Sequence, residues 1–332
     1  MKLIYQIILI ISLIVVTIPR FNWGGMGPLK SFVGGKPFDI EQYETYTKYF
    51  SGEKEKGSEM EGPFAYRPFV PFLASFLPFE ALTSINLINL LFLIITLYPL
   101  VGLLKHFKLE GNYLLLGEVL FVFSFPVFYY GTSGYIDSVL IAFIMMGTYL
   151  LLNKKLFLFF LTFVIGMSVK ETIIILIPVF AVYLFFLKNV SLRKKIMLFL
   201  SLIIIYGMGM FFLRRFTPGA ESYIWYPSFD IFFSNLARSK TYLSIFLTFG
   251  LPGIGALSCI YKFLRNKVGF TQEAVLITGL LISMLISFFS LFAAYADGRH
   301  IWTSYPFTIP LAIIYLKSLK KPGSLLLKFQ NS

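Results

Sequence analysis

The chain consists of one apolar run after another, and most of these runs are long enough to cross a membrane. A transmembrane helix needs about 20 predominantly apolar residues, because the hydrocarbon core of a bilayer is about 30 Å thick. Hydrophobic residues make up 57% of the chain and charged residues only 14%, whereas a soluble domain has about 25% charged residues. The sequence therefore predicts an all-α integral membrane protein and excludes a soluble enzyme, a disulfide scaffold and a disordered chain.

We predict about ten transmembrane helices in a single polytopic domain, residues 1–332. The first run follows Lys2 and resembles a signal peptide, but no small-residue cleavage site precedes Arg20, which favours a retained helix. The ten predicted spans are Leu3 to Pro19, Ala81 to Leu104, Tyr113 to Tyr130, Tyr135 to Leu152, Leu156 to Val169, Thr172 to Leu187, Ile196 to Leu213, Tyr242 to Phe263, Glu273 to Tyr295 and Ile301 to Leu316.

The distribution of lysine and arginine predicts the orientation, because cytoplasmic loops retain positive charge. With ten spans and both termini cytoplasmic, 16 of the 29 basic residues but only three acidic residues lie on the cytoplasmic side. The net charge of +13 is then a property of that face and favours anionic lipid head groups, not nucleic acid, as the partner. Two long outer loops follow from this topology, at residues 20–80 and 214–240.

Charged residues gather at the predicted outer ends of different spans. Ionisable side chains at membrane depth cost about 2.5 kcal/mol or more and often mark a pathway or a site. Their convergence on one face therefore predicts an extracytoplasmic functional site. Five groups are involved: Asp39 with Glu41, Arg67, Asp137, Lys170 with Glu171, and Asp297 with Arg299 and His300.

The first of these groups suits proton transfer or cation binding. Asp39 and Glu41 point the same way in an extended loop and apart in a helix. They are either an exposed acidic surface, or a carboxylate that accepts a proton from a hydroxyl or holds a divalent cation. Arg67 precedes a Pro-rich apolar segment and is either an interfacial arginine or a phosphate clamp, since guanidinium binds phosphate bidentately.

The remaining groups lie at predicted helix ends. Asp137 is either a carboxylate favoured by the helix dipole or the partner of a cation in the site. Lys170 and Glu171 separate two short apolar runs and predict a turn sunk into the membrane, with a role beyond simple connection. His300 alone is more typical of an interfacial histidine, and Arg299 beside it is the stronger candidate for phosphate binding.

Several enzyme classes lack their sequence signals. The chain contains no P-loop, no GxGxxG motif after a strand, no HExxH motif and no GxSxG nucleophile elbow. Nucleotide hydrolysis, dinucleotide-dependent redox chemistry and zinc proteolysis are therefore not indicated. Cys259 is the single cysteine and lies in an apolar run, which excludes a disulfide framework and predicts a packing role.

Five short segments contain most of these charged residues. They are Asp39-Ile40-Glu41 with Tyr43, Tyr66-Arg67-Pro68-Phe69-Val70-Pro71, Gly134 to Asp137, Gly166 to Glu171, and Arg299 with Tyr305 and Pro306. Their arrangement resembles the GT-C superfamily of multi-spanning membrane glycosyltransferases, which use polyprenyl-phosphate or pyrophosphate sugars on the outer or lumenal face of a membrane. The resemblance implies a GT-C-like fold and a multi-pass protein of the plasma (inner) membrane.

The resemblance also implies roles for individual residues. Asp39 or Glu41 would be the catalytic carboxylate, and it is open which; a divalent cation held by the two is also open, and no other cofactor is implied. The donor phosphate would bind to Arg67, Lys170 and Arg299. Supporting roles would fall to Asp137, Glu171, Asp297 and His300.

The implied activity is transfer of a sugar, with inversion, from a polyprenyl-phosphate-linked donor to a glycolipid or glycan of the cell envelope. Ten spans in 332 residues leave no room for a large soluble domain, so acceptor recognition is expected in the loops. Two alternatives stay open. One is a transporter or flippase for a lipid-linked sugar or other anion, although the chain shows no repeated halves. The other is an outer-face glycan polymerase.

Overall fold

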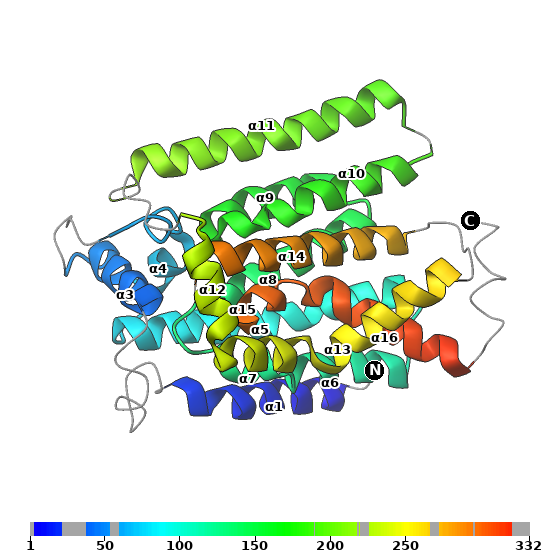
Figure 1. The fold of residues 1–332 in the computed structure, drawn as a ribbon, viewed down its shortest axis with the longest axis horizontal. Helices are drawn as coiled ribbons and strands as arrows, with labels where there is room; N and C mark the ends of the chain where they lie inside the picture. Colours follow the sequence, from blue (N-terminus) through cyan, green and yellow to red (C-terminus); the bar gives the residue numbers. More distant parts are fainter. Residues whose placement is uncertain are drawn as a thin grey trace.

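The computed structural model describes residues 3–21, 38–53, 60–188, 190–217, 219, 226–265, 272–294 and 296–320. The all-helical prediction is confirmed for these residues, which form helices and turns without a β-strand. Most helices lie along one long axis, and short helices cover one end of the bundle (Figure 1). The short helices at this end, which we call the α3 end, are α3 (Phe38–Phe50), α4 (Phe69–Ala74), α12 (Phe229–Ala237) and α15 (Gly298–Trp302).

The other helical passages lie along the bundle between the α3 end and the opposite end (Figure 1). α1 begins at the opposite end, and α16 finishes there (Figure 1). Within the described residues, six helices or helix pairs are long and apolar enough to cross a membrane, and four apolar helices are shorter. The elements of these passages are α1 (Leu3–Phe21), α5 (Ala81–His106), α6 (Asn112–Val122), α7 (Phe125–Tyr130), α8 (Asp137–Leu152), α9 (Leu156–Val169), η1 (Glu171–Ile175), α10 (Leu176–Phe186), α11 (Leu192–Phe216), α13 (Ser239–Arg265), α14 (Glu273–Ala293) and α16 (Tyr305–Lys320).

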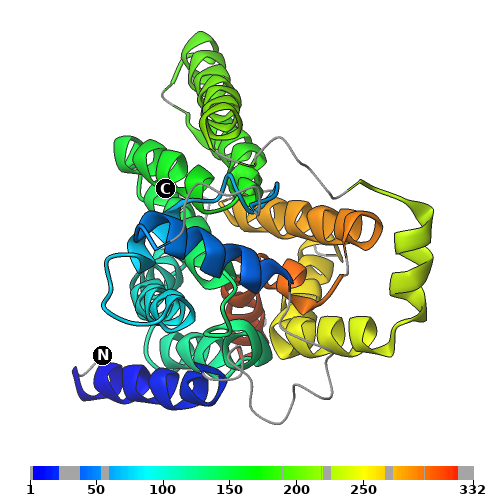
Figure 2. The same cartoon turned by 90° about the vertical axis from the view of Figure 1, so that its left-hand side faces the viewer.

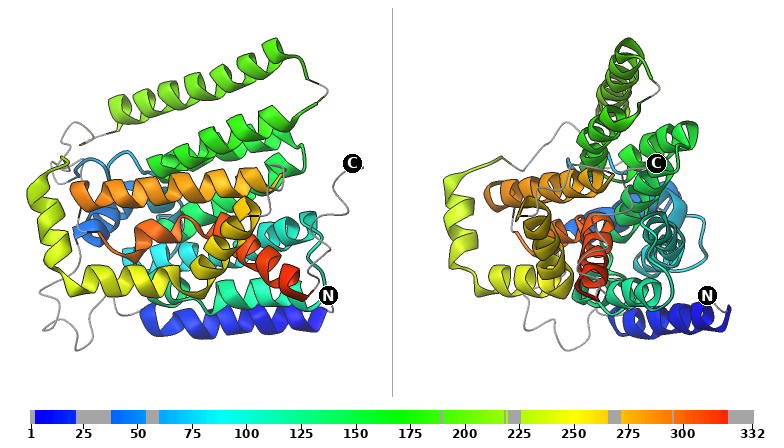
Figure 3. Two further views of the ribbon diagram at one scale, coloured as in Figure 1. Left: turned by 45° about the vertical axis from the view of Figure 1, so that its right-hand side comes forward. Right: turned by 90° about the vertical axis from the view of Figure 1, so that its right-hand side faces the viewer.

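The core of the bundle is formed by large apolar side chains of α5, α8, α9, α10 and α16. Among the fully buried side chains are Phe121, Phe159, Phe180 and Phe307. Burial of each such side chain contributes about 1.5–3 kcal/mol in water, whereas within lipid the gain comes from close packing. α11 projects away from the bundle and contacts it through α9 and α10 (Figures 2 and 3). Its apolar side chains are largely exposed, as expected for a helix that faces lipid.

Prolines and glycines divide several of the predicted spans. The predicted span Tyr113 to Tyr130 is broken between α6 and α7: α7 begins at Phe125 behind the cap residue Ser124, with Pro126 in its first turn. The predicted span Ile301 to Leu316 is likewise divided, into α15 and α16. α13 breaks at Gly250, whose φ of 40° is left-handed, two residues before Pro252.

The break in α13 leaves one backbone carbonyl without its helical partner. Pro252 has no N–H to donate to the oxygen of Thr248, four residues earlier. The hydroxyl of Tyr305 in α16 donates to this oxygen instead, at 2.7 Å. The bond fixes the first half of α13 against the start of α16.

The two predicted outer loops are not irregular throughout. Residues 38–50 of the first loop form α3, and the following segment contains α4. The second loop contains α12. Residues 22–37, 54–59 and 220–225 of these loops lie outside the described part of the chain. Asp39 and Glu41 therefore lie in a helix, so their side chains point apart and not the same way.

Candidate functional site

Seven of the nine sequence-predicted site residues take part in ion pairs at the α3 end, and the imidazole of an eighth, His300, lies 3.8 Å from the Asp297 carboxylate. They come from elements far apart in the chain. The groups also lie close enough to interact electrostatically, since Asp137 is affected by Arg299 and His300 as well as by its partner Lys170. The exception is Glu41, which is exposed. The structure thus brings the five predicted groups together, and it shows which acid lies against which base.

The first pair joins Arg67 to Glu171. The guanidinium donates from Nε to one carboxylate oxygen at 2.8 Å and from Nη2 to the other, and its Nη1 donates to the Tyr43 hydroxyl at 3.0 Å. The arginine side chain is only 7% exposed. Burial opposes its charge, but Glu171 and Tyr43 together outweigh burial and raise the pKa of Arg67 above its ordinary value. This arginine is permanently charged and already holds a bidentate anion.

A second pair joins Lys170 to Asp137. Lys170 lies between α9 and η1 in extended backbone, with φ −165° and ψ 138°. This conformation ends α9 and lets the ammonium donate to Asp137 Oδ1 at 2.7 Å. Asp137 is buried in the first turn of α8, where the helix dipole also favours a carboxylate. The predicted turn between two short apolar helices is therefore present, and its lysine is anchored on the neighbouring helix.

The start of α8 is fixed by a glycine in a left-handed conformation. Gly134 has φ 88°, and a Cβ added there would lie 2.8 Å from side-chain atoms of Ile40 and Leu82. Its N–H donates to the side chain of Asn86 at 2.7 Å. Only glycine fits this turn without strain, and the turn sets Tyr135 and Asp137 into the site.

The third group is built around Arg299. Asp297 caps α15 by accepting the Arg299 backbone N–H at 2.9 Å, and its oxygens also accept from the guanidinium Nε at 3.2 Å. The guanidinium reaches across to α3, where Nη1 donates to Asp39 Oδ2 at 3.0 Å. It also lies 3.7 Å from the centre of the Tyr135 ring. Burial opposes the charge, but Asp297 and the other surrounding groups raise the pKa of Arg299.

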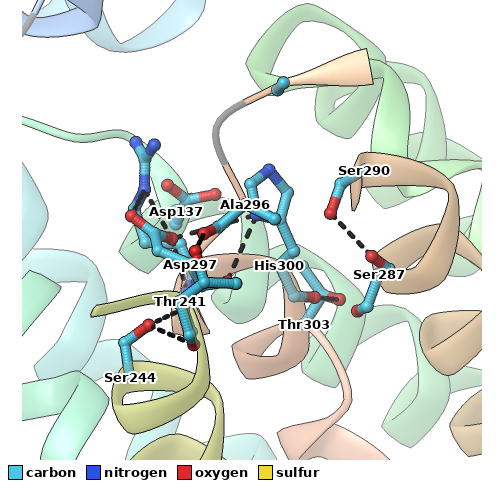
Figure 4. Close-up of polar contacts among 12 residues, drawn as sticks. Asp137, Thr241, Ser244, Ser287, Ser290, Ala296, Asp297, His300 and Thr303 are labelled. Atoms are coloured by element: carbon cyan, nitrogen blue, oxygen red, sulfur yellow. Dashed lines mark hydrogen bonds and ion pairs between the residues drawn. The ribbon is translucent and has the colours of Figure 1, made fainter. Parts of the chain in front are cut away.

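His300 is next to this group. Figure 4 shows Asp297, His300 and Thr303 of the α14–α16 connection, with Asp137 on one side and Ser287 and Ser290 of α14 on the other. The imidazole Nδ1 is 3.3 Å from the backbone oxygen of Asp297 and 3.8 Å from a carboxylate oxygen of the same residue. Burial lowers the pKa of His300, and the opposing effect of Asp297 does not restore it. His300 is therefore neutral at pH 7.

A test of His300 follows from the direction of this shift. Below about pH 6.5, the ordinary pKa of histidine, the unfolded chain binds a proton at this position before the folded chain does. The stability that the neutral imidazole retains above this pH is therefore lost as the pH falls. Thermal unfolding of the wild type should shift further than that of His300→Gln between about pH 7.5 and about pH 5.5. Parallel shifts in the two proteins would show that His300 does not titrate as described.

The side chains of Asp39 and Glu41 point in different directions. They lie in the first turn of α3, and two residues along a helix point roughly opposite ways. Asp39 faces Arg299, whereas Glu41 faces outward. Among the described residues, no group of three or more His, Cys, Asp or Glu side chains is placed to hold a metal ion. The geometry favours Asp39 over Glu41 as the carboxylate of the site.

Uncharged residues that the sequence did not predict also shape the site. Tyr135 lies under Arg299, and the Tyr43 hydroxyl binds Arg67. Asn86 and Asn89 of α5 hold the backbone of residues 134 and 135. Two fully buried amides three residues apart in an apolar span were a usable signal, because a buried amide requires polar partners.

The comparisons with known proteins give no family for this chain: no model of a protein family matches it, and no curated protein matches it. The chemistry must therefore be argued from the site. It contains one partly accessible guanidinium, carboxylates on either side of it, and a neutral imidazole. Such a set can bind a phosphate and accept a proton from a hydroxyl group.

Proposed function

We propose that this protein is a membrane glycosyltransferase that moves a sugar from a polyprenyl-phosphate-linked donor to a glycolipid or glycan acceptor. The observation that carries the proposal is the pairing of Asp39 with Arg299, 260 residues apart, beside the Lys170–Asp137 pair at one end of an apolar helical bundle. Displacing a phosphate from a sugar requires a base that accepts the acceptor proton and a cation that binds the phosphate, and this pair can supply both.

The proposal places ten spans in the plasma (inner) membrane, with both termini cytoplasmic and the α3 end outside. Six long apolar helices and four shorter ones are compatible with that number. The start of α1 and the end of α16 share the end opposite α3. Lys154 and Lys155 lie in the α8–α9 connection at that end, and Lys194 and Lys195 lie in the first turn of α11 there, as the positive-inside rule requires of the cytoplasmic face.

In the proposed reaction, the donor phosphate binds Arg299 and displaces Asp39 from it. The acceptor oxygen forms a bond to the anomeric carbon while the bond from that carbon to the phosphate oxygen breaks. The acceptor proton passes to Asp39, and polyprenyl phosphate leaves with the bonding electrons. Attack opposite the leaving group inverts the anomeric centre. Arg299 and Lys170 stabilise the negative charge that develops on the phosphate.

In this proposal Arg67 is a positioning residue and not the principal phosphate ligand. Both of its hydrogen-bonding edges are occupied, by Glu171 and by Tyr43, and its side chain is 7% exposed. Direct binding of the donor phosphate would require breaking this buried pair. The geometry therefore favours Arg67 as the residue that positions η1 and Lys170, with Arg299 as the principal phosphate ligand.

The proposal is tested with cells in which the gene is deleted, restored, or restored as Asp39→Asn at equal protein level. The deletion should remove a sugar from the surface glycans and cause its lipid-linked donor to accumulate on the outer face. Asp39→Asn should fail to restore the sugar, because an amide cannot take up the acceptor proton. Glu41→Gln is the matched control and should restore it.

Three results would redirect the proposal. Full restoration by Asp39→Asn would remove Asp39 from the chemistry. Trapping of the lipid-linked precursor on the cytoplasmic face would favour the transporter or flippase alternative. Loss of long glycan chains with normal single transfers would favour the outer-face polymerase.

A further inference from the structure

α12 differs in direction from the apolar helices of the bundle. It lies across the α3 end, whereas α13 and α14 run along the long axis (Figures 1 and 2). One side of α12 presents Phe229, Phe233 and Leu236, which are 70%, 62% and 40% exposed. The adjoining residues Asp230 and Ser234 are exposed and polar. A short helix with this pattern at the end of a membrane bundle suits the boundary between lipid head groups and acyl chains.

The opposite side of α12 packs on the end of α14. The rings of Phe232 and Phe292 are stacked, with centroids 4.4 Å apart. Next to them Asn235 is fully buried and uses both ends of its amide. Its Nδ2 donates to the backbone oxygens of Leu291 at 2.8 Å and Ala294 at 2.7 Å, and its Oδ1 accepts the N–H of Ala296 at 3.0 Å.

These three hydrogen bonds fix the backbone that leads to Arg299. The polar side chains at the start of α13 continue the support: Thr241 donates to the oxygen of Ala296 at 3.1 Å, and the N–H of Gly298 donates to Ser244 at 3.1 Å. A Cβ at Gly298 would collide with Thr248 and with the backbone of Ser244. The backbone at Ala294, Ala296 and Gly298 is thus held by side chains of α12 and α13.

We propose that α12 is a membrane-surface helix whose contact with lipid, transmitted by Asn235 through the backbone at Ala294 and Ala296, positions Arg299. The consequence for catalysis rests on the proposed function, whereas the positioning itself does not. The occupant of the exposed apolar side is the lipid surface. The exposed apolar side of α12 is followed along the chain by the exposed side chains of Tyr242, Leu243 and Phe246, which belong to the candidate membrane span α13.

The positioning is tested by thiol accessibility in the full-length protein in lipid nanodiscs. With Cys259 replaced by serine, Ala296→Cys introduces the sole cysteine at a site that is 3% exposed. Adding Asn235→Ala removes three backbone hydrogen bonds, so labelling by a water-soluble maleimide should accelerate about tenfold or more. Asn235→Asp keeps the acceptor for Ala296 N–H but loses the donors, and should give a smaller increase.

The matched control is Thr148→Ala. Thr148 is also fully buried and hydrogen-bonds within α8, to the oxygen of Ile144 at 2.8 Å. It should leave the labelling rate unchanged. Equal labelling rates in the wild-type background and in Asn235→Ala would overturn the positioning. So would an equal acceleration by Thr148→Ala, because that would indicate general loosening of the protein.

The lipid contact is tested with an environment-sensitive fluorophore on Phe233→Cys, compared with Ser234→Cys on the polar side. The label at 233 should be quenched by nitroxide attached near the head of the lipid chains, and the label at 234 by iodide in water. Quenching of both labels mainly by iodide would overturn the membrane contact.

Sugar transfer by the same variants separates this inference from the proposed function. Asn235→Ala should raise the KM for the lipid-linked donor more than it lowers kcat, with Asn235→Asp giving partial rescue; a purely structural loss would instead reduce the amount of active protein without changing KM. If the accessibility changes as expected but the wild type transfers no sugar, the positioning stands and the proposed function fails.

Discussion

Arg299→Ala is expected to reduce sugar transfer by a factor of about 10² to 10³, the usual cost of removing a group that stabilises developing charge. The guanidinium is the principal cation that the site can offer to a phosphate without breaking a buried bidentate pair. Its removal also leaves Asp39 and Asp297 with no counter-ion at this point, so that they repel the incoming phosphate. The effect should therefore appear in both kcat and the KM for the donor.

The measurement is transfer from a polyprenyl-phosphate sugar by the purified protein in lipid nanodiscs. Arg299→Lys retains the charge but cannot contact Asp297 and Asp39 together, so partial activity is expected. Arg193→Ala serves as the control, since Arg193 is exposed at the opposite end of the bundle and should be without effect. Wild-type kinetics in Arg299→Ala would exclude the proposed phosphate site.

The sequence predicted the membrane class and the convergence of charges because both follow from a strong physical cost. A charged group such as Lys170 or Asp137 does not persist in an apolar chain without a partner. The cost does not determine which partner it has. Asp137 could have paired with any basic residue at the same end, and the helix lengths and turns that select Lys170 depend on packing.

The direction of Asp39 could not be read from its spacing to Glu41 because that spacing is compatible with a loop or a helix. Asn235 was beyond sequence reasoning for a different reason. It lies among aromatic and polar residues in a segment expected to be a loop, where an asparagine is ordinary. Only the fold shows that its amide meets three backbone groups on either side of residue 295.

Glu171→Ala is expected to destabilise the protein by about 3 kcal/mol or more, because it leaves Arg67 charged, buried and without its bidentate partner. Removing the arginine instead, by Arg67→Met, should reduce the free energy of unfolding by less. The Glu171 side chain is 29% exposed, so it can be partly hydrated when Arg67→Met removes its partner, whereas the arginine side chain is only 7% exposed. The double variant should be about as stable as Arg67→Met alone.

Unfolding of the purified variants in mixed detergent micelles would give these differences, with Glu41→Ala as an exposed control that should change stability by about 0.5 kcal/mol at most. The cycle also separates the two roles open to Arg67. If the pair serves positioning, the stable double variant should retain much of its sugar transfer, since Lys170 and Arg299 keep their own partners. If Arg67 binds the donor phosphate directly, the double variant should be stable and nearly inactive. A double variant as unstable as Glu171→Ala would contradict the asymmetry of burial on which the expectation depends.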